Sequence, residues 1–66
     1  MLTVEDVEKR VAQIASVASD DEVAHIKEDG LWLEVLHVIA QGSPLSRELA
    51  TAALKTRELD FARWCA

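Results

Sequence analysis

The fold follows from one stretch of the chain, residues 31–44, which reads LWLEVLHVIAQGSP. Its first ten residues carry one formal charge, on Glu34, so apolar side chains occupy almost every face of the helix that they predict. A helix of this kind is usually the central one of a small protein. Gly42 then suits the left-handed conformation that ends a helix, and Ser43 and Pro44 are typical of the N-cap and first position of the next helix.

Upstream of this stretch, Ser19 and Glu22 have the spacing of a capping box, which predicts the start of the central helix. We expect that helix over about residues 20–41. Gly30 costs roughly 1 kcal/mol relative to alanine inside a helix, and we interpret it as a weak point in one continuous helix. The residues expected to face the core are Val23, Ile26, Leu33, Leu36 and Ile39.

Two further helices flank the central one. Thr3 as N-cap, with Asp6 in the first turn, begins a helix over about residues 4–18. Its apolar residues recur at spacings of three and four, at Val4, Val7, Val11, Ile14 and Ala18. The last helix is expected over about residues 44–56, with inner positions at Leu45, Leu49, Ala52 and Ala53.

The end of the chain contains two of its three aromatic residues, Phe61 and Trp64. A helical turn at about residues 60–65, folded back over the bundle, would shelter both rings from water. The sequence therefore predicts an all-α fold in a single domain, 1–66: a compact three-helix bundle with a short C-terminal helical turn packed across it.

Composition excludes several classes of function. The net charge of −5 divides into −6 over residues 1–42 and +1 over residues 43–66, so direct nucleic-acid binding, which needs a basic stripe, is not expected. The one cysteine, Cys65, allows neither an intrachain disulfide nor a thiolate zinc site. No uncharged stretch approaches the roughly 20 residues of a membrane span, and acidic residues stand where the apolar core of a signal peptide would be. We expect a cytoplasmic protein without a cofactor.

Half of the twelve acidic residues lie in one short segment with a single cation, Lys27, among them. The segment leads directly into the apolar helix, where Trp32 competes with its neighbours for the inner face. Carboxylates that steer an approaching partner, beside aromatic anchors, are typical of a protein-binding surface. The residues predicted to bind a protein partner are Asp21, Glu22, Glu28, Asp29, Trp32 and Trp64. The charge asymmetry favours a basic partner or self-association.

A second interpretation of the same segment is a divalent-metal site. Glu22-x-x-His25 and Glu34-x-x-His37 both have the Glu-x-x-His spacing of four-helix di-metal proteins. They lie about 18 Å apart along one helix, so only a homo-oligomer could bring them together. Enzymatic activity is not expected, because the chain has two glycines and no loop that could cradle a phosphate or an oxyanion.

The succession Asp20-Asp21-Glu22, Ala24-His25, Glu28-Asp29 and the ending Asp60-Phe61-Ala62-Arg63-Trp64-Cys65 resemble small acidic helical proteins of actinobacterial phages and prophages. The resemblance covers about the last two-thirds of the chain and assigns no catalytic residue. It implies an accessory protein that acts in the host cytoplasm by binding a host or phage protein. A structural component of a larger assembly is the remaining alternative.

Overall fold

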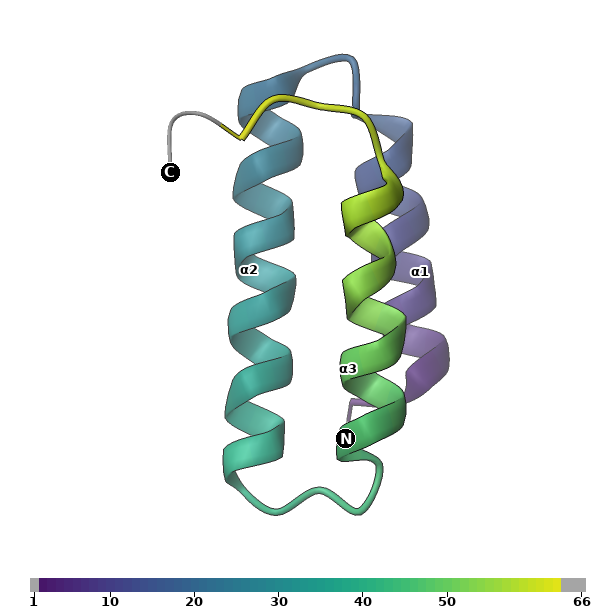
Figure 1. Cartoon of the computed structure of the whole chain (residues 1–66), viewed down its shortest axis with the longest axis vertical. Helices are drawn as coiled ribbons and strands as arrows, with labels where there is room; N and C mark the ends of the chain where they lie inside the picture. The colour runs from purple at the N-terminus through teal and green to yellow at the C-terminus, as the bar shows by residue number, and fades with distance from the viewer. Residues whose placement is uncertain (1, 64–66) are drawn as a thin grey trace.

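The computed structural model describes residues 2–63 and is an up–down–up bundle of helices (Figure 1). Helix α1 spans Val4–Ser16, α2 spans Asp21–Ala40 and α3 spans Ser46–Leu54, and the 3₁₀ turn η1, Lys55–Glu58, continues α3. Each of the three helices packs against the other two. The prediction of an all-α three-helix bundle is confirmed. No helix within residues 2–63 has the length and hydropathy that crossing a membrane requires.

The start of α1 is the predicted one. The Thr3 side chain accepts a hydrogen bond from the Asp6 backbone amide at 3.1 Å, and the Asp6 carboxylate accepts one from the Thr3 amide at 3.0 Å. This reciprocal pair is a capping box, which satisfies donors that the first helical turn leaves free. The same hydrogen bonds with Thr3 lower the pKa of Asp6 below its ordinary value.

The predicted cap of α2 is wrong by one residue. Asp20, not Ser19, is the N-cap, and its carboxylate accepts a hydrogen bond from the Val23 amide at 3.2 Å. The turn that follows α1 closes only when the Asp20 amide bonds to the Val17 carbonyl, so the chain becomes extended one position later than the sequence pattern suggests. From there α2 runs without a break through Gly30, as predicted.

The connection between α2 and α3 confirms Gly42 as the residue that ends the helix, with a φ of 87°. The following helix starts two residues later than predicted. The Ser43 hydroxyl accepts a hydrogen bond from the Leu45 amide and so organises a turn, while the N-cap position of α3 falls on Leu45. Pro44 is therefore a turn residue here rather than the first residue of a helix.

The core contains one buried stripe from each helix: Val7 and Ile14 of α1, Ala24, Leu31 and Val35 of α2, and Leu49, Ala52 and Ala53 of α3. The stripes of α1 and α3 are the predicted ones. The inward face predicted for α2 is wrong, because Val23, Ile26, Leu33 and Leu36 are all exposed. Glu28 instead shares the stripe with Ala24, Leu31 and Val35, at spacings of four, three and four. Ile39 is half-buried against the core.

The chain end crosses the bundle as predicted, but not as a helical turn. After η1, residues 59–63, here called the C-terminal strap, are non-helical and pass over the N-terminal end of α2 (Figure 1). Phe61 is 7% exposed and belongs to the core cluster, which confirms the prediction that it folds back. Residues 64 and 65, the rest of the predicted turn, lie outside the described residues.

Candidate protein-binding surface

Glu28 is not part of an exposed acidic face. It is 2% exposed, and its carboxylate accepts two hydrogen bonds from the Arg63 guanidinium, from Nε at 2.8 Å and from Nη2 at 3.0 Å. Arg63 also donates to the carbonyls of Thr56 and Phe61 and lies over the Phe61 ring, 3.8 Å from its centre. Because the strap covers Glu28 in this way, the prediction that Glu28 contacts a partner is wrong.

The pKa of Glu28 reflects this setting. Burial of the carboxyl group raises the pKa, but hydrogen bonds from Arg63 and Thr56 and the positive charges of Arg63 and Arg57 outweigh burial, so the pKa lies below its ordinary value of 4.5. The pKa of Arg63 is raised, chiefly by its hydrogen bonds to Glu28. Both residues are therefore charged at neutral pH, and the pair fixes the strap to α2.

The other predicted acidic residues divide into two groups. Asp21 accepts a hydrogen bond from the Ala62 backbone amide at 3.0 Å, so it also holds the strap. Glu22 and Asp29 are exposed on α2 and remain candidates for electrostatic steering. Asp29 Oδ1 lies 3.4 Å from Nε2 of His25, which is buried.

Trp32 joins α2 to the end of α3. The ring is half-buried, and its Nε1 donates to the Ala53 carbonyl at 3.2 Å and to the Thr56 hydroxyl at 3.1 Å. These bonds satisfy the polar end of the indole and fix the orientation of the ring. Its exposed part is then a rigid apolar surface between the two helices. Trp64, the other predicted aromatic anchor, lies outside the described residues.

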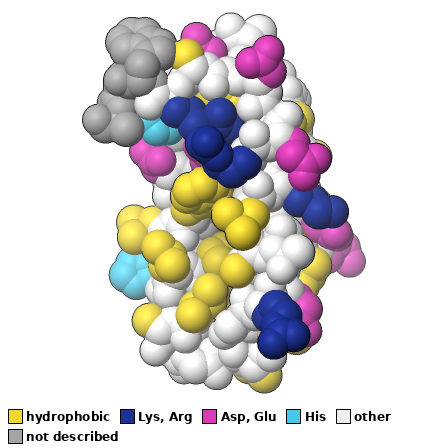
Figure 2. Space-filling model, viewed as in Figure 1, with side chains coloured by type: hydrophobic (Ala, Val, Ile, Leu, Met, Phe, Trp, Pro, Cys, Tyr) yellow, Lys and Arg dark blue, Asp and Glu magenta, His cyan; other side chains and the backbone are white. Residues whose placement is uncertain are grey.

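Beside Trp32 is an open groove between α2 and α3. Every residue that lines it is apolar: Trp32, Val35, Leu36 and Ile39 from α2, and Ala50, Ala53 and Leu54 from α3. We call it the α2–α3 groove. Its rims are the exposed side chains of Leu36 and Leu54, which are 62% and 58% exposed. Figure 2 shows hydrophobic side chains gathered on the face that α2 and α3 form, beneath a group of basic side chains.

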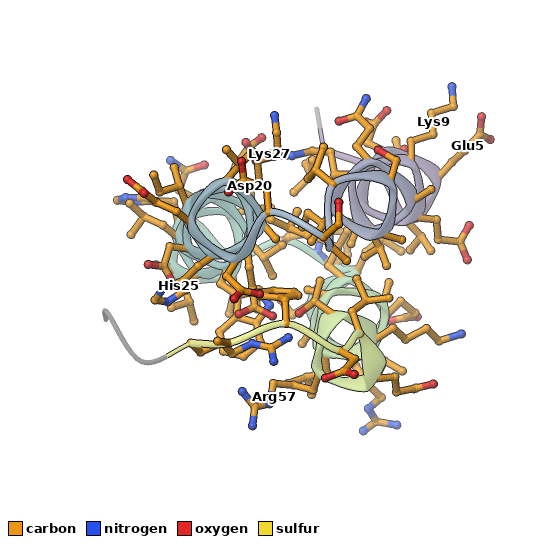
Figure 3. All side chains as sticks on the ribbon, turned by 90° about the horizontal axis from the view of Figure 1, so that it is seen from above. Glu5, Lys9, Asp20, His25, Lys27 and Arg57 are labelled. Carbon is orange, nitrogen blue, oxygen red and sulfur yellow. The ribbon has the colours of Figure 1, made fainter. Side chains whose placement is uncertain are left out.

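Charged residues border the groove with opposite signs. On the α3 side, Arg47 and Arg57 are exposed and continue the stripe of Ala50 and Leu54 at spacings of three and four. On the α2 side, Asp29 is exposed one turn before Trp32 and two turns before Leu36. Seen along the helices, Arg57 and His25 lie on the same side of the bundle, and Glu5 and Lys9 of α1 point away from it (Figure 3).

The groove was not predicted from the sequence, although the sequence contains a signal for it. Trp32, Leu36 and Ile39 form a second apolar stripe on α2, at spacings of four and three, displaced by about 100° from the buried one. The bundle buries this second stripe only in part, since Trp32 and Ile39 are half-buried and Leu36 is exposed. The small side chains of Ala50 and Ala53 opposite leave the space that makes the surface concave.

The residues of the alternative metal site do not come together in one chain. Among residues 2–63, no group of three or more histidine, cysteine, aspartate or glutamate side chains is placed to hold a metal ion. Glu34 pairs with Arg10 of α1, and His25 lies next to Asp29. His37 and Glu22 are exposed at separate places on α2.

Comparisons with protein-family models, with curated proteins and with solved structures find no match to this chain.

Proposed function

We propose that this chain is a non-enzymatic protein-binding module and that its contact surface is the α2–α3 groove. One observation carries the proposal: a groove lined only by apolar side chains, with leucines more than half exposed on both rims, lies open on a 66-residue chain. Contiguous apolar surface of this kind on a small protein is typical of interaction sites, because water contact with it is unfavourable.

The shape of the groove favours a helical partner. It runs between two neighbouring antiparallel helices, so the apolar ridge of a third helix fits along it. Trp32 would supply a rigid aromatic contact at one end of the groove, because hydrogen bonds already fix the indole. Glu22 and Asp29 on α2 would steer the approach of a basic segment.

The cellular setting that we propose comes from the resemblance to actinobacterial phage and prophage proteins. In that setting the chain acts in the host cytoplasm as an accessory protein, and its partner is a host or phage protein. An actinobacterial lysate, with and without phage infection, is therefore the appropriate source of partners.

Affinity capture from such a lysate tests the proposal with two matched variants. Leu36→Arg places a charge on the rim of the groove, and Ile26→Arg places the same charge on the outer face of α2, where Ile26 is 64% exposed and Leu36 is 62% exposed. We expect the wild type and Ile26→Arg to retain the same proteins and Leu36→Arg to lose them. Equal retention by both variants, each folded by circular dichroism, would refute the groove as the contact surface.

A further inference from the structure

We propose that the occupant of the α2–α3 groove is a second copy of this chain, with α2 of each copy lying against α3 of the other. This inference rests on the proposed function and names its partner. The two copies would form a four-helix bundle from two α2 and two α3 helices, with both α1 helices outside it.

The shape of the face is the first argument. The same face carries both the hollow, floored by Ala50 and Ala53, and the projecting rims, Leu36 and Leu54. A two-fold axis makes each patch meet the same patch of the other copy, so such a surface can complement itself. Dimerisation would bury the exposed side chains of Leu36 and Leu54 together, whereas a narrower ligand would cover only the hollow between them.

Charge decides between the two possible two-fold arrangements. In one, α3 lies on α3 and the basic borders, Arg47 and Arg57, oppose each other across the interface. In the other, α2 lies on α3, and the acidic border of one copy meets the basic border of the second. The second arrangement is favoured, since like charges in opposition disfavour association.

The positions of Asp29 and Arg57 along the helix axes agree with the arrangement in which α2 lies on α3. The hydrogen bond from Trp32 to Thr56 shows that the α2 turn containing residues 29–32 lies beside η1 within one copy. A two-fold axis parallel to the helices keeps every residue at its own level. Asp29 of one copy therefore arrives next to Arg57 of the other, and the symmetric pair forms a second time.

The size of the face indicates a reversible dimer. The bundle measures 34 × 21 × 17 Å along its principal axes, and α2 and α3 form the broad face that Figure 1 presents. A rectangle of the two longer dimensions has an area on the order of 700 Å², comparable with the roughly 800 Å² that each partner buries in a standard interface. Obligate dimers usually bury larger areas, so we expect a monomer–dimer equilibrium rather than an obligate dimer.

Sedimentation velocity over a concentration series tests the dimer and its arrangement. For the wild type we expect a monomer–dimer equilibrium. Leu36→Arg should raise the dissociation constant about tenfold or more, because it places an unpaired charge in an apolar interface. Ile26→Arg, the same change on the outer face of α2, should leave the constant within about twofold of the wild-type value.

Charge reversal then tests which helices meet. Asp29→Arg and Arg57→Asp should each weaken the dimer about fivefold, and the double variant, which keeps the net charge at −5, should restore the wild-type constant within about twofold. Restoration of the wild-type dissociation constant supports the arrangement in which α2 of one copy lies on α3 of the other. Additive weakening in the double variant overturns this arrangement.

The outcomes also separate this inference from the proposed function. A wild-type chain that stays monomeric up to millimolar concentration overturns the dimer. If Leu36→Arg still loses its captured partner in that case, the groove remains a protein-binding surface for another protein. If the chain is monomeric and Leu36→Arg loses nothing, both proposals fail.

Discussion

At the scale of single residues, the Glu28–Arg63 pair is the contact that local sequence could not reveal. The two residues are 35 positions apart, and Glu28 lies in the same acidic segment as the exposed acids of α2. Burial of a carboxylate is unfavourable unless the charge is paired and hydrogen-bonded, and Arg63 supplies both conditions. Arg63 therefore converts a residue that resembled a surface acid into an anchor for the strap.

Removing Arg63 should destabilise the fold, because Glu28 would keep a buried charge without its partner. We expect Arg63→Ala to lower the free energy of unfolding by roughly 3 kcal/mol. Arg10→Ala is the matched control, since the Arg10–Glu34 pair is partly exposed, with side chains 32% and 49% exposed, and should contribute below about 1 kcal/mol. Urea unfolding at pH 7 measures both, and equal losses in the two variants would contradict the role given to Arg63.

The same pair predicts how stability depends on pH. The pKa of Glu28 in the folded chain lies below 4.5, its ordinary value, so the unfolded chain takes up a proton at higher pH than the folded one. The contribution of the ionised Glu28 carboxylate to the free energy of unfolding should be complete above about pH 5. It should decline as the pH falls below 4.5 toward the lowered pKa of Glu28 in the folded chain. Unfolding of the wild type and of Glu28→Gln between pH 3 and 7 measures it. A stability difference that grows on acidification would contradict the assignment.

At the scale of the elements, the helices were predictable because their signals are local. The capping box at Thr3, the periodic stripe of α1 and the positive φ of Gly42 each follow from a few neighbouring residues. The face that α2 buries was not predictable in the same way. Apolar residues surround that helix, so contacts with α1 and α3, not periodicity, decide that Leu31 is buried and Leu33 is exposed.

The two glycines should respond in opposite directions to the same substitution. A Cβ at Gly30 would meet only the Arg10 side chain at 3.9 Å, so Gly30→Ala should stabilise α2 by up to about 1 kcal/mol. Gly42 has a φ of 87°, where alanine is strained, so Gly42→Ala should destabilise by about 1 kcal/mol. Thermal unfolding of both variants tests this. Destabilisation by Gly30→Ala would show that α2 needs a glycine there.

At the scale of the whole molecule, Thr56 of η1 connects the groove to the strap. Thr56 accepts a hydrogen bond from Trp32 at the groove, and its carbonyl accepts one from Arg63 of the strap. The candidate site could be predicted from the sequence only in part: Trp32 and Asp29 belong to it, but Glu28 and Asp21 hold the strap instead. The contribution of α3, through Ala50, Ala53 and Leu54, appears only when the helices are packed together.

The measurement that most directly tests the groove as a self-association surface is a series of ¹⁵N–¹H correlation spectra from micromolar to millimolar concentration. The account predicts shifts that move with concentration at α2–α3 groove residues such as Leu36 and Leu54, and at Asp29 and Arg57. Glu5 and Lys9 on α1, which point away from that face (Figure 3), should not move. Spectra that are independent of concentration, or shifts confined to α1, would contradict the account.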